Sequence, residues 1–484
     1  MKRILYLSLL TLIYSFATLS AYAEVRLPKI VSSNMVLQRD ATVALWGWAD
    51  AGEQLTIKTS WLAKELKLTA DKQGTWRVDV KTTNSKSPQT IEIKSKTSEI
   101  KLDNILFGEV WLCSGQSNME QPVKGFSAQP TYGGLMATAK SSNPNLRLFT
   151  VGRAFSVTPL ADLEKGNGWQ VADPDQVSEF SAVGYFFAQQ LQEILDVPVG
   201  VIHTSWGGSK VEAWMSQEVL GQYEEVALDG VDLSDHTQWI PTVLFNAMVY
   251  PLMPFTIKGV LWYQGESNRR DPERYKSTFP AMVKDWRSRW GLGDFPFYYV
   301  QIAPYRYKAN GGYQTPDNSA FIREAQLQCL DSIPNSGIAI TMDVGDSLWI
   351  HPPKKKEVAD RLLFNALNQT YGFKSVDHAS PVYESQEISE GSILLSFAHA
   401  ETGLYAYGPL SGFEIAGADH VFYPAQAQIV DRMKVEVQSD QVPAPVAVRY
   451  AWRNWVEGTL FDTNLLPASS FRTDNWTAAT RAGE

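Results

Sequence analysis

Hydrophobic and polar positions alternate along much of residues 24–106. The apolar positions of this alternation are Leu55 and Ile57, then Trp76, Val78 and Val80, then Ile91 and Ile93. A period of two places such side chains on one face of a strand and the polar residues on the other. Gly, Asp, Asn and Ser separate the alternating stretches, as is typical of turns. The pattern predicts a small β-sandwich domain over residues 24–106.

Between residues 107 and 375, apolar stretches alternate with segments of helical periodicity. The candidate strands cover residues 107–114, 197–204, 257–264, 295–302 and 337–343. The candidate helices cover residues 183–195, 273–289, 319–331 and 354–371. Strands that alternate with helices form right-handed crossovers and a parallel sheet covered on both faces. The expected fold class is α/β, a doubly wound parallel sheet that binds ligands at the carboxyl ends of its strands.

Strand patterns return in residues 376–484, at 393–397, 433–437 and 446–452. This C-terminal segment is too rich in strands to continue an α/β layer. It either forms a sandwich of its own or packs with the N-terminal β-domain, and the pattern does not choose between these arrangements.

The first residues have the pattern of a secretory signal peptide. Lys2 and Arg3 precede an apolar stretch over residues 4–19, and small residues follow at Ala21 and Ala23. This order predicts cleavage after Ala23 and export, to the periplasm or out of the cell. The apolar stretch is short for a membrane span, and no other stretch is long and apolar enough. Since no cysteine stands at the cut site, a lipid anchor is not expected.

Composition and charge narrow the classes of function. Hydrophobic residues make up 44% and charged residues 20% of the chain, as in ordinary folded proteins. The net charge of −9 argues against nucleic acid as a partner, because that partner needs a basic face. The chain has 16 Trp and 20 Tyr, some of which could stack on sugar rings, although most are expected in the core.

Neither a metal nor an organic cofactor is expected. The two cysteines, Cys113 and Cys329, form no disulfide framework and are expected to be buried free thiols. The chain has no HExxH motif and no cluster of its six histidines, which makes a zinc site improbable on sequence grounds. It also lacks a Walker loop and a GxGxxG turn.

Four polar segments follow predicted strands, where the topology places ligands. The first is Gly115-Gln116-Ser117-Asn118-Met119. A serine directly after a strand can present its hydroxyl at the sheet edge, beside backbone N–H groups that stabilise an oxyanion. Met119 stands where a GxSxG elbow has its second glycine, which disfavours an ordinary α/β-hydrolase.

The second and third segments could supply further polar groups to the same edge. Gly207 and Gly208 follow the strand at 197–204, and paired glycines let a backbone N–H approach a ligand closely. Gln264-Gly265-Glu266-Ser267-Asn268 crowds side chains that must be hydrogen-bonded if they are buried. A plain tight turn and a purely structural network are the competing interpretations.

The fourth segment contains His351, which is followed by Pro352 and Pro353. The two prolines fix the backbone beside the imidazole, which suits a general base. A hydroxyl, an imidazole and several N–H donors are therefore predicted to converge at one edge of the sheet.

These four segments, in this order, resemble the SGNH-type hydrolases of the sialate O-acetylesterase family. The resemblance extends to Asn34-Met35-Val36-Leu37-Gln38-Arg39 and to Pro445-Val446-Ala447-Val448-Arg449-Tyr450, so it covers nearly all of the chain after residue 23. The combination of the motifs at 115–119 and 264–268 is specific, whereas either alone would only be suggestive. The resemblance implies an SGNH-like sheet with all-β regions at both ends, acting as a cofactor-free serine esterase on O-acetylated sugars.

The resemblance also implies roles for individual residues. Ser117 matches the nucleophile and His351 the general base. The oxyanion hole would comprise the N–H groups of Ser117 and of Gly207 or Gly208, and the side chain of Gln264, with Asn268 as the weaker alternative for Gln264. Trp206 and Trp262 would shape the sugar site.

One departure from the family pattern concerns the group that orients His351. Many relatives carry an aspartate two or three residues before the histidine, where this chain has Trp349 and Leu348. Glu266, Asp346 or a backbone carbonyl could orient the imidazole instead, and Glu266 is the preferred candidate.

Three alternative functions remain open from the sequence. The substrate could be acetylated xylan or another polysaccharide instead of sialic acid. The chain could be a carbohydrate-binding protein without catalysis, although Ser117, Gln264 and His351 argue against this. A glycosidase would use facing carboxylates such as Glu266 and Asp346, which would leave the serine and glycine segments unexplained. The oligomeric state cannot be read from the sequence.

Overall fold

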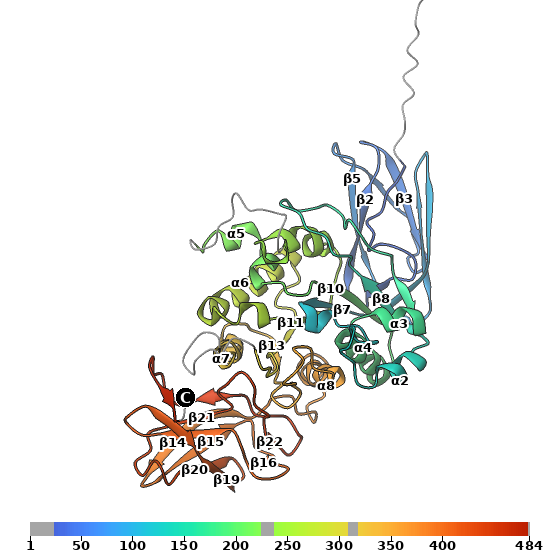
Figure 1. Cartoon of the computed structure of the whole chain (residues 1–484). Coiled ribbons are helices and arrows are strands. Elements are labelled where there is room, and N and C mark those ends of the chain that lie inside the picture. The colour runs from blue at the N-terminus through green and yellow to red at the C-terminus, as the bar shows by residue number, and fades with distance from the viewer. Residues whose placement is uncertain (1–23, 224–236, 308–317, 483–484) are drawn as a thin grey trace, which may run out of the picture.

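The computed structural model describes residues 24–223, 237–307 and 318–482. These residues form three regions in a row, with a β-rich region at each end of a central α/β layer (Figure 1). The predicted signal peptide, residues 1–23, lies outside the described residues.

The N-terminal β-region consists of strands whose alternate side chains are buried. Its strands are β1 (Val36–Gln38), β2 (Thr42–Trp48), β3 (Gln54–Thr59), β4 (Leu66–Thr69), β5 (Thr75–Lys81) and β6 (Gln89–Lys94). Strand β2 pairs with β5, and β3 pairs with β4 and β6, in all three cases antiparallel. Leu55, Ile57, Trp76 and Ile91 are buried, as the alternation predicted.

Strand β7 (Glu99–Gly115) joins the N-terminal region to the central layer without a linker. Its first half pairs antiparallel with β6, and its second half pairs parallel with strands of the central sheet. The predicted domain boundary between residues 106 and 107 therefore falls inside a continuous strand.

The central sheet has the strand order β13-β12-β11-β7-β10-β8-β9. Its further strands are β8 (Asn143–Thr150), β9 (Gln170–Ala172), β10 (Val199–Ser205), β11 (Gly259–Tyr263), β12 (Phe297–Val300) and β13 (Ser336–Ala339). All neighbours pair parallel except β8 and β9, which pair antiparallel. Every strand predicted in this layer is present. Strands β8 and β9 were not predicted, because β8 begins with polar residues and carries Arg147 in its middle.

Helices cover both faces of the central sheet. The described helices are α1 (Ser117–Glu120), α2 (Gly134–Ala139), α3 (Pro174–Glu179), α4 (Ala182–Leu195), α5 (Gln217–Leu220), α6 (Pro272–Trp290), α7 (Ala320–Gln328) and α8 (Lys355–Asn365). Helices α4 and α8 pack against one face, which includes Trp111 and Tyr263. Helices α6 and α7 pack against the other, which includes Leu112 and Trp262. This two-sided burial explains why the strands at the centre of the sheet, β7, β11 and β12, are rich in apolar residues.

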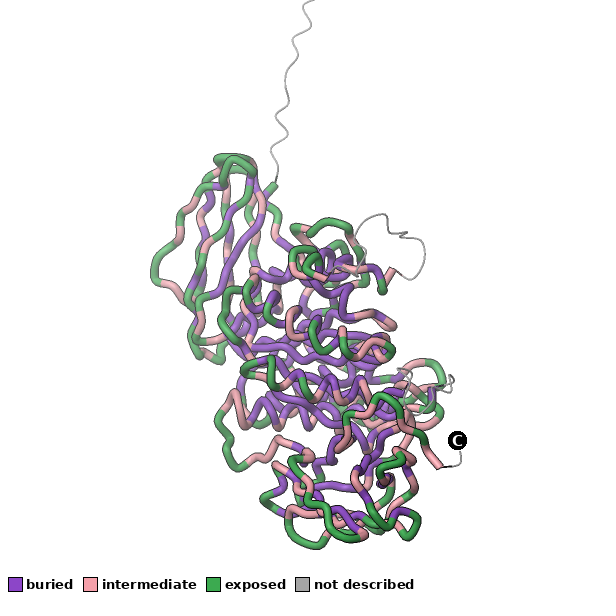
Figure 2. The backbone as a smooth tube through the Cα atoms, turned by 90° about the vertical axis from the view of Figure 1, so that its left-hand side faces the viewer, coloured by how far each residue is buried: buried purple, intermediate pink, exposed green. Residues whose placement is uncertain are grey.

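The C-terminal β-region lies at the opposite end of the molecule from the N-terminal one (Figures 1 and 2). Its strands are β14 (Val382–Ser389), β15 (Ser392–Ala398), β16 (Leu404–Tyr405), β17 (Phe413–Ala416), β18 (Val421–Pro424), β19 (Gln426–Asp431), β20 (Lys434–Gln438), β21 (Ala447–Tyr450), β22 (Phe461–Asp462), β23 (Phe471–Arg472) and β24 (Thr480–Arg481). They form sheets of order β14-β15-β20-β19 and β23-β21-β17-β18-β24 and the pair β16-β22. The described C-terminal strands therefore form sheets of their own and do not pack with the N-terminal β-region.

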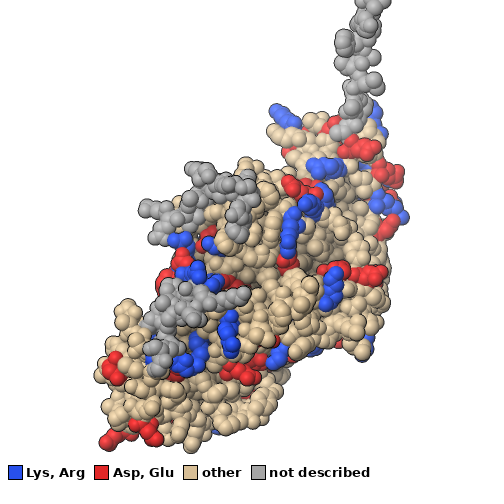
Figure 3. Space-filling model, in the orientation of Figure 1, with Lys and Arg blue, Asp and Glu red and all other residues tan. Residues whose placement is uncertain are grey.

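Buried residues are concentrated in the central layer, and they continue into both β-regions (Figure 2). Acidic and basic side chains are mixed over the molecular face shown in Figure 3. Cys113 and Cys329 are buried free thiols, as expected. No helix in the described ranges is long and apolar enough to cross a membrane.

Candidate active site

A glycine in an unusual backbone conformation brings the serine segment to the sheet edge. Gly115, the last residue of β7, has φ +137°, where side-chain-bearing residues are strained. A Cβ atom at Gly115 would lie 2.2 Å from the carbonyl oxygen of Tyr263 on β11. The next amide, of Gln116, donates to that same oxygen at 3.0 Å. The chain then turns into α1, whose first residue is Ser117.

A cavity of about 770 Å³ opens at the carboxyl ends of β7, β10 and β11. Of the predicted site residues, it is lined by Ser117, Gly207, Gly208, Glu266, Asn268 and His351. Gln264, Trp206, Trp262 and Asp346 are not part of its lining. The structure therefore brings the predicted nucleophile and base to one cavity, although they are far apart in the chain.

The hydroxyl of Ser117 is available for reaction. Among the described residues, no hydrogen bond involves its Oγ atom, so none joins it to His351. Catalytic hydrogen bonds are often long in the absence of substrate. Gly207 lies next to the serine, since a Cβ atom added to this glycine would be 3.3 Å from Cβ of Ser117.

His351 is held by a glutamine. Its Nδ1 lies 2.6 Å from Oε1 of Gln129, and the ring of Phe126 packs edge-on at 5.3 Å between centroids. With the amide oxygen as acceptor, Nδ1 carries the proton and Nε2 keeps its lone pair. Burial, followed by the positive charge of Lys355, lowers the pKa of His351 to about 4. The imidazole is thus neutral near neutral pH and able to accept a proton.

The two carboxylates proposed as partners of His351 have other partners. Oε1 of Glu266 accepts a hydrogen bond from Nδ2 of Asn118 at 2.5 Å. Oδ1 of Asp346 accepts from the amides of Leu348 and Trp349. The preference for Glu266 does not match this geometry. Gln129 was missed, because a glutamine in an irregular loop carries no sequence signal for this task.

The predicted oxyanion donors differ in their availability. Nε2 of the buried Gln264 donates to the Ser209 carbonyl at 3.1 Å and to Oδ1 of Asn268 at 2.7 Å. Because both N–H groups are in use, Gln264 does not match its predicted role. The N–H of Gly207 donates to Oε2 of Glu120 at 2.9 Å, whereas no described residue accepts from the N–H of Gly208.

Asn268 was the weaker candidate in the sequence and is the better placed side chain. Its Oδ1 accepts from Gln264 and from the amide of Val211. Its Nδ2 donates one hydrogen to Glu212 at 2.9 Å. The second N–H of Nδ2 has no acceptor among the described residues, and Asn268 lines the cavity.

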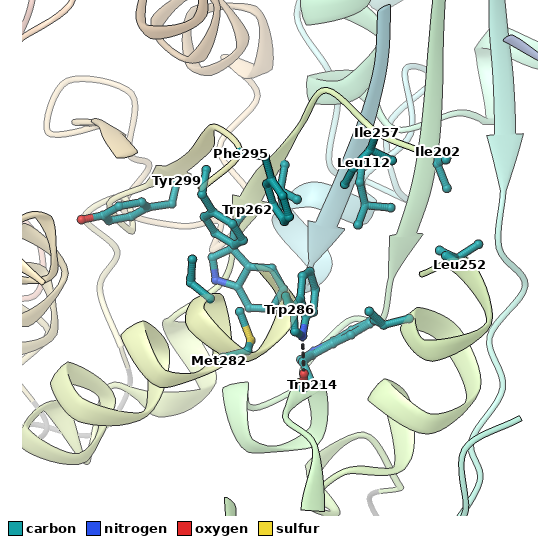
Figure 4. Packing of buried hydrophobic residues seen from close by; sticks show 14 of the residues in the cluster. Leu112, Ile202, Trp214, Leu252, Ile257, Trp262, Met282, Trp286, Phe295 and Tyr299 are labelled. Atoms are coloured by element: carbon teal, nitrogen blue, oxygen red, sulfur yellow. Dashed lines mark hydrogen bonds between the residues drawn. The ribbon is translucent and has the colours of Figure 1, made fainter. Parts of the chain in front are cut away.

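Neither tryptophan predicted to shape the sugar site lines the cavity. Trp262 is fully buried and packs between Trp214, Phe279 and Trp286 in the core beneath α6 (Figure 4). Trp262 belongs to the apolar strand β11, and its ring lies on the face of the sheet that α6 covers. The exposed aromatic residue of the cavity is Trp239, whose Nε1 donates to the Gly208 carbonyl at 2.6 Å.

Comparison with known proteins identifies the family of the chain. Residues 107–363 match the model of the family described as "Carbohydrate esterase, sialic acid-specific acetylesterase". The human protein named sialate O-acetylesterase is 30% identical, with 91% of this chain and 90% of the relative covered. The rat sialate O-acetylesterase is 28% identical, with 92% and 93% covered.

A solved structure shows the same architecture. A carbohydrate acetylesterase from Xanthomonas citri superposes with a TM-score of 0.85 at 36% identity, covering 94% of this chain and all of the other. The family resemblance seen in the motifs is confirmed, as is the prediction of a carbohydrate O-acetylesterase. The chain therefore belongs to the carbohydrate esterase family of sialic acid-specific acetylesterases.

Proposed function

We propose that Ser117 is the nucleophile and His351 the general base of this esterase. The observation that carries the proposal is that both residues line one cavity at the carboxyl ends of the strands. Gln129 fixes the tautomer of His351, so that Nε2 can accept the serine proton. A neutral amide takes the place that a carboxylate has in the familiar triad.

The reaction proceeds in two steps through an acetyl-enzyme. His351 removes the proton of Ser117 while Oγ attacks the acetyl carbonyl carbon. The tetrahedral intermediate collapses, and the protonated histidine returns the proton to the departing sugar oxygen. Water, deprotonated by the same histidine, attacks the acetyl group, and acetate leaves as Ser117 regains its proton.

The negative charge of the tetrahedral intermediate needs N–H donors nearby. The N–H groups of Ser117 and Gly208 and the second N–H of Asn268 supply them. Gln264 does not contact the intermediate itself. Its Nε2 donates to Oδ1 of Asn268 and so orients the amide nitrogen of Asn268. We also propose that the α/β layer has the fold of SGNH-type hydrolases. This assignment is based on the arrangement of one serine, one glycine, one asparagine and one histidine around the cavity.

We propose an O-acetylated sialic acid as substrate. The relatives named sialate O-acetylesterases support this choice. The cavity wall holds the basic side chains of Lys210, Arg269, Arg270 and Arg274 beside the acidic ones of Glu212, Glu266 and Asp271, and a cationic side chain complements the carboxylate of an acidic sugar.

Two experiments test the proposal. Acetate release from O-acetylated sialic acid is compared with release from acetylated xylan, and a clear preference for xylan would refute the substrate. Ser117→Ala is expected to abolish hydrolysis of a chromogenic acetyl ester and labelling by a fluorophosphonate. Wild-type turnover by this variant would refute the nucleophile.

We also propose that the protein is exported, on the basis of the charged, apolar and small-residue pattern of residues 1–23. Mass spectrometry of protein expressed with its full N-terminus is expected to find Glu24 as the first residue. An intact N-terminus on protein recovered from the cytoplasm would count against export.

A further inference from the structure

Asn118, the residue after Ser117, joins the segments that carry the candidate catalytic groups. Its Nδ2 donates to Glu266 at 2.5 Å and to the carbonyl of Ile350 at 3.1 Å. Its Oδ1 accepts from Nζ of Lys355 at 2.5 Å. Since Ile350 immediately precedes His351, one amide side chain connects the neighbour of the nucleophile with the neighbour of the base.

Lys355 is an unusual residue in this network because its charge is buried. It has 0% exposure, and Glu266 has 4%. Burial lowers the pKa of Lys355 to about 7, opposed by the charge of Glu266. Burial raises the pKa of Glu266. A buried charge is costly unless it is paired, and here the amide of Asn118 bridges the two charges.

The two charges also determine which way the amide of Asn118 points. A lysine ammonium only donates and a carboxylate only accepts, so the amide oxygen faces Lys355 and the nitrogen faces Glu266. With the opposite orientation, the nitrogen would face an ammonium and the carbonyl of Ile350 would lose its donor. The position of the loop that carries His351 therefore depends on Lys355.

We infer that Lys355 is a positioning residue of the esterase reaction, which holds the His351 loop at the correct distance from Ser117 through Asn118. This inference rests on the proposed function. Lys355 does not line the cavity, so it acts through its neighbours and does not touch the substrate.

A purely structural role of Lys355 would balance the charge of Glu266 and nothing more. Removal of both buried charges separates the two roles, because charge balance alone then predicts a wild-type kcat, whereas a lost positioning contact keeps kcat low. The acid limb of the pH profile reports only that the ammonium of Lys355 lowers the pKa of His351. The other charged groups lining the cavity with His351 are Lys210, Glu212, Glu266, Arg269, Arg270, Asp271 and Arg274. Substitution of Lys355 leaves these groups in place.

The test is Lys355→Met, which keeps the length of the side chain and removes its charge. We expect kcat for a chromogenic acetyl ester to fall roughly tenfold to a hundredfold, because the base is misplaced. KM should change less than about threefold. The acid limb of the kcat/KM profile should move up by on the order of 1 pH unit, because His351 loses a repelling charge.

The matched control is Lys356→Met, the same change at the next residue of α8. Lys356 is half exposed and pairs with Asp360, and its loss should leave kcat and the acid limb unchanged. If Lys355→Met does not fold, Lys355→Met combined with Glu266→Gln removes both buried charges. That double variant is then expected to fold and still to show the lowered kcat.

An unchanged kcat in a folded Lys355 variant would overturn the inference. This outcome is distinct from failure of the proposed function. If Ser117→Ala is inactive and the Lys355 variants behave like the wild type, only the positioning role is refuted. If Ser117→Ala stays active, the nucleophile itself is wrong.

Discussion

The Nδ1–H of His351 is bonded to the neutral amide oxygen of Gln129. A neutral acceptor stabilises the imidazolium of the transition state less than a carboxylate does. It still fixes the tautomer and the ring orientation, which a general base requires. At the scale of single residues, this enzyme therefore has a histidine of fixed orientation, and burial followed by the charge of Lys355 lowers the pKa of its imidazole to about 4.

The lowered pKa of His351 predicts the acid side of the pH profile. In the proposed mechanism the histidine must be neutral to accept the proton of Ser117, and with the lowered pKa it stays neutral until the pH falls to about 4. We expect kcat/KM to remain high through weakly acidic pH and to fall only near that value. Steady-state kinetics with a chromogenic ester would show this, and an acid midpoint near the usual histidine value would contradict it.

Substitution of Gln129 tests how the imidazole is oriented. Gln129→Ala removes the acceptor of Nδ1, so kcat should drop on the order of tenfold to a hundredfold, part of what a positioned base contributes. Gln129→Glu supplies a carboxylate, which should keep activity and raise the pKa of His351, so the acid limb should move to higher pH. Equal kinetics in both variants and in the wild type would exclude Gln129 from this role.

Asn268 and Gln264 are expected to differ in their effect on catalysis. Asn268→Ala removes a donor from the cavity, so kcat should fall on the order of a hundredfold or more, and it also breaks buried hydrogen bonds with Val211, Gln264 and Glu212, which destabilises the fold. Gln264→Ala removes buried hydrogen bonds to Ser209 and Asn268, so it should also lower the free energy of unfolding by about 1–3 kcal/mol. Kinetics and urea unfolding of both variants check this. If Gln264→Ala lowered kcat and left the free energy of unfolding unchanged, Gln264 would be assigned to the oxyanion hole after all.

At the scale of elements, the site is built where β7, β10 and β11 end side by side. The chain turns at a glycine at the end of each strand. Gly115 is the last paired residue of β7, and Gly207 and Gly265 stand two residues after the last paired residues of β10 and β11. Small residues let the three turns approach one another. Gly207 lies so close to α1 that an added Cβ would be 3.0 Å from Oε2 of Glu120 and 3.3 Å from Cβ of Ser117.

Gly207→Ala should therefore impair catalysis more than folding. The added methyl group pushes on the serine, and we expect kcat/KM to fall about tenfold or more. The unfolding free energy should change by only about 1 kcal/mol. Gly408→Ala is the control, because its added Cβ meets nothing within 4 Å. Full activity of Gly207→Ala would show that this turn yields without disturbing Ser117.

At the scale of the whole molecule, the C-terminal β-region is tied to the central layer by buried polar contacts. Arg323 on α7 is fully buried and donates to the carbonyls of Ala451 and Arg453 and to the hydroxyl of Ser470. Nε2 of Gln301, after β12, donates to Ser469 at 2.9 Å. With β7 continuous at the other end, the three regions are expected to unfold as one unit.

Arg323→Ala should destabilise the whole protein, because it leaves buried carbonyls without donors. We expect a loss on the order of 3 kcal/mol in unfolding free energy, seen as a lower midpoint of a single thermal transition. Arg77→Ala breaks an exposed ion pair with Asp79 and should cost less than about 1 kcal/mol. If Arg323→Ala showed two thermal transitions and only one of them had a lower midpoint, the C-terminal region would fold independently.

Hydrophobic periodicity was enough to predict most of the α/β layer and the strands at both ends. The same pattern could not locate β8 and β9, whose burial depends on neighbouring strands more than on their own composition. It also could not tell a buried tryptophan from a surface one: Trp262, which the family resemblance placed at the sugar site, is buried, whereas Trp239 lines the cavity.

By itself, the sequence determined which residues stand at the carboxyl ends of the strands, because strand and turn patterns are local. That was sufficient to name Ser117, the glycine turn and His351. Only the tertiary structure decided that Gln129 holds His351, that Asn268 faces the cavity in place of Gln264, and that Lys355 holds Asn118. These partners are separated by up to 237 positions in the chain, and hydrogen bonds across such distances depend on packing that no local pattern encodes.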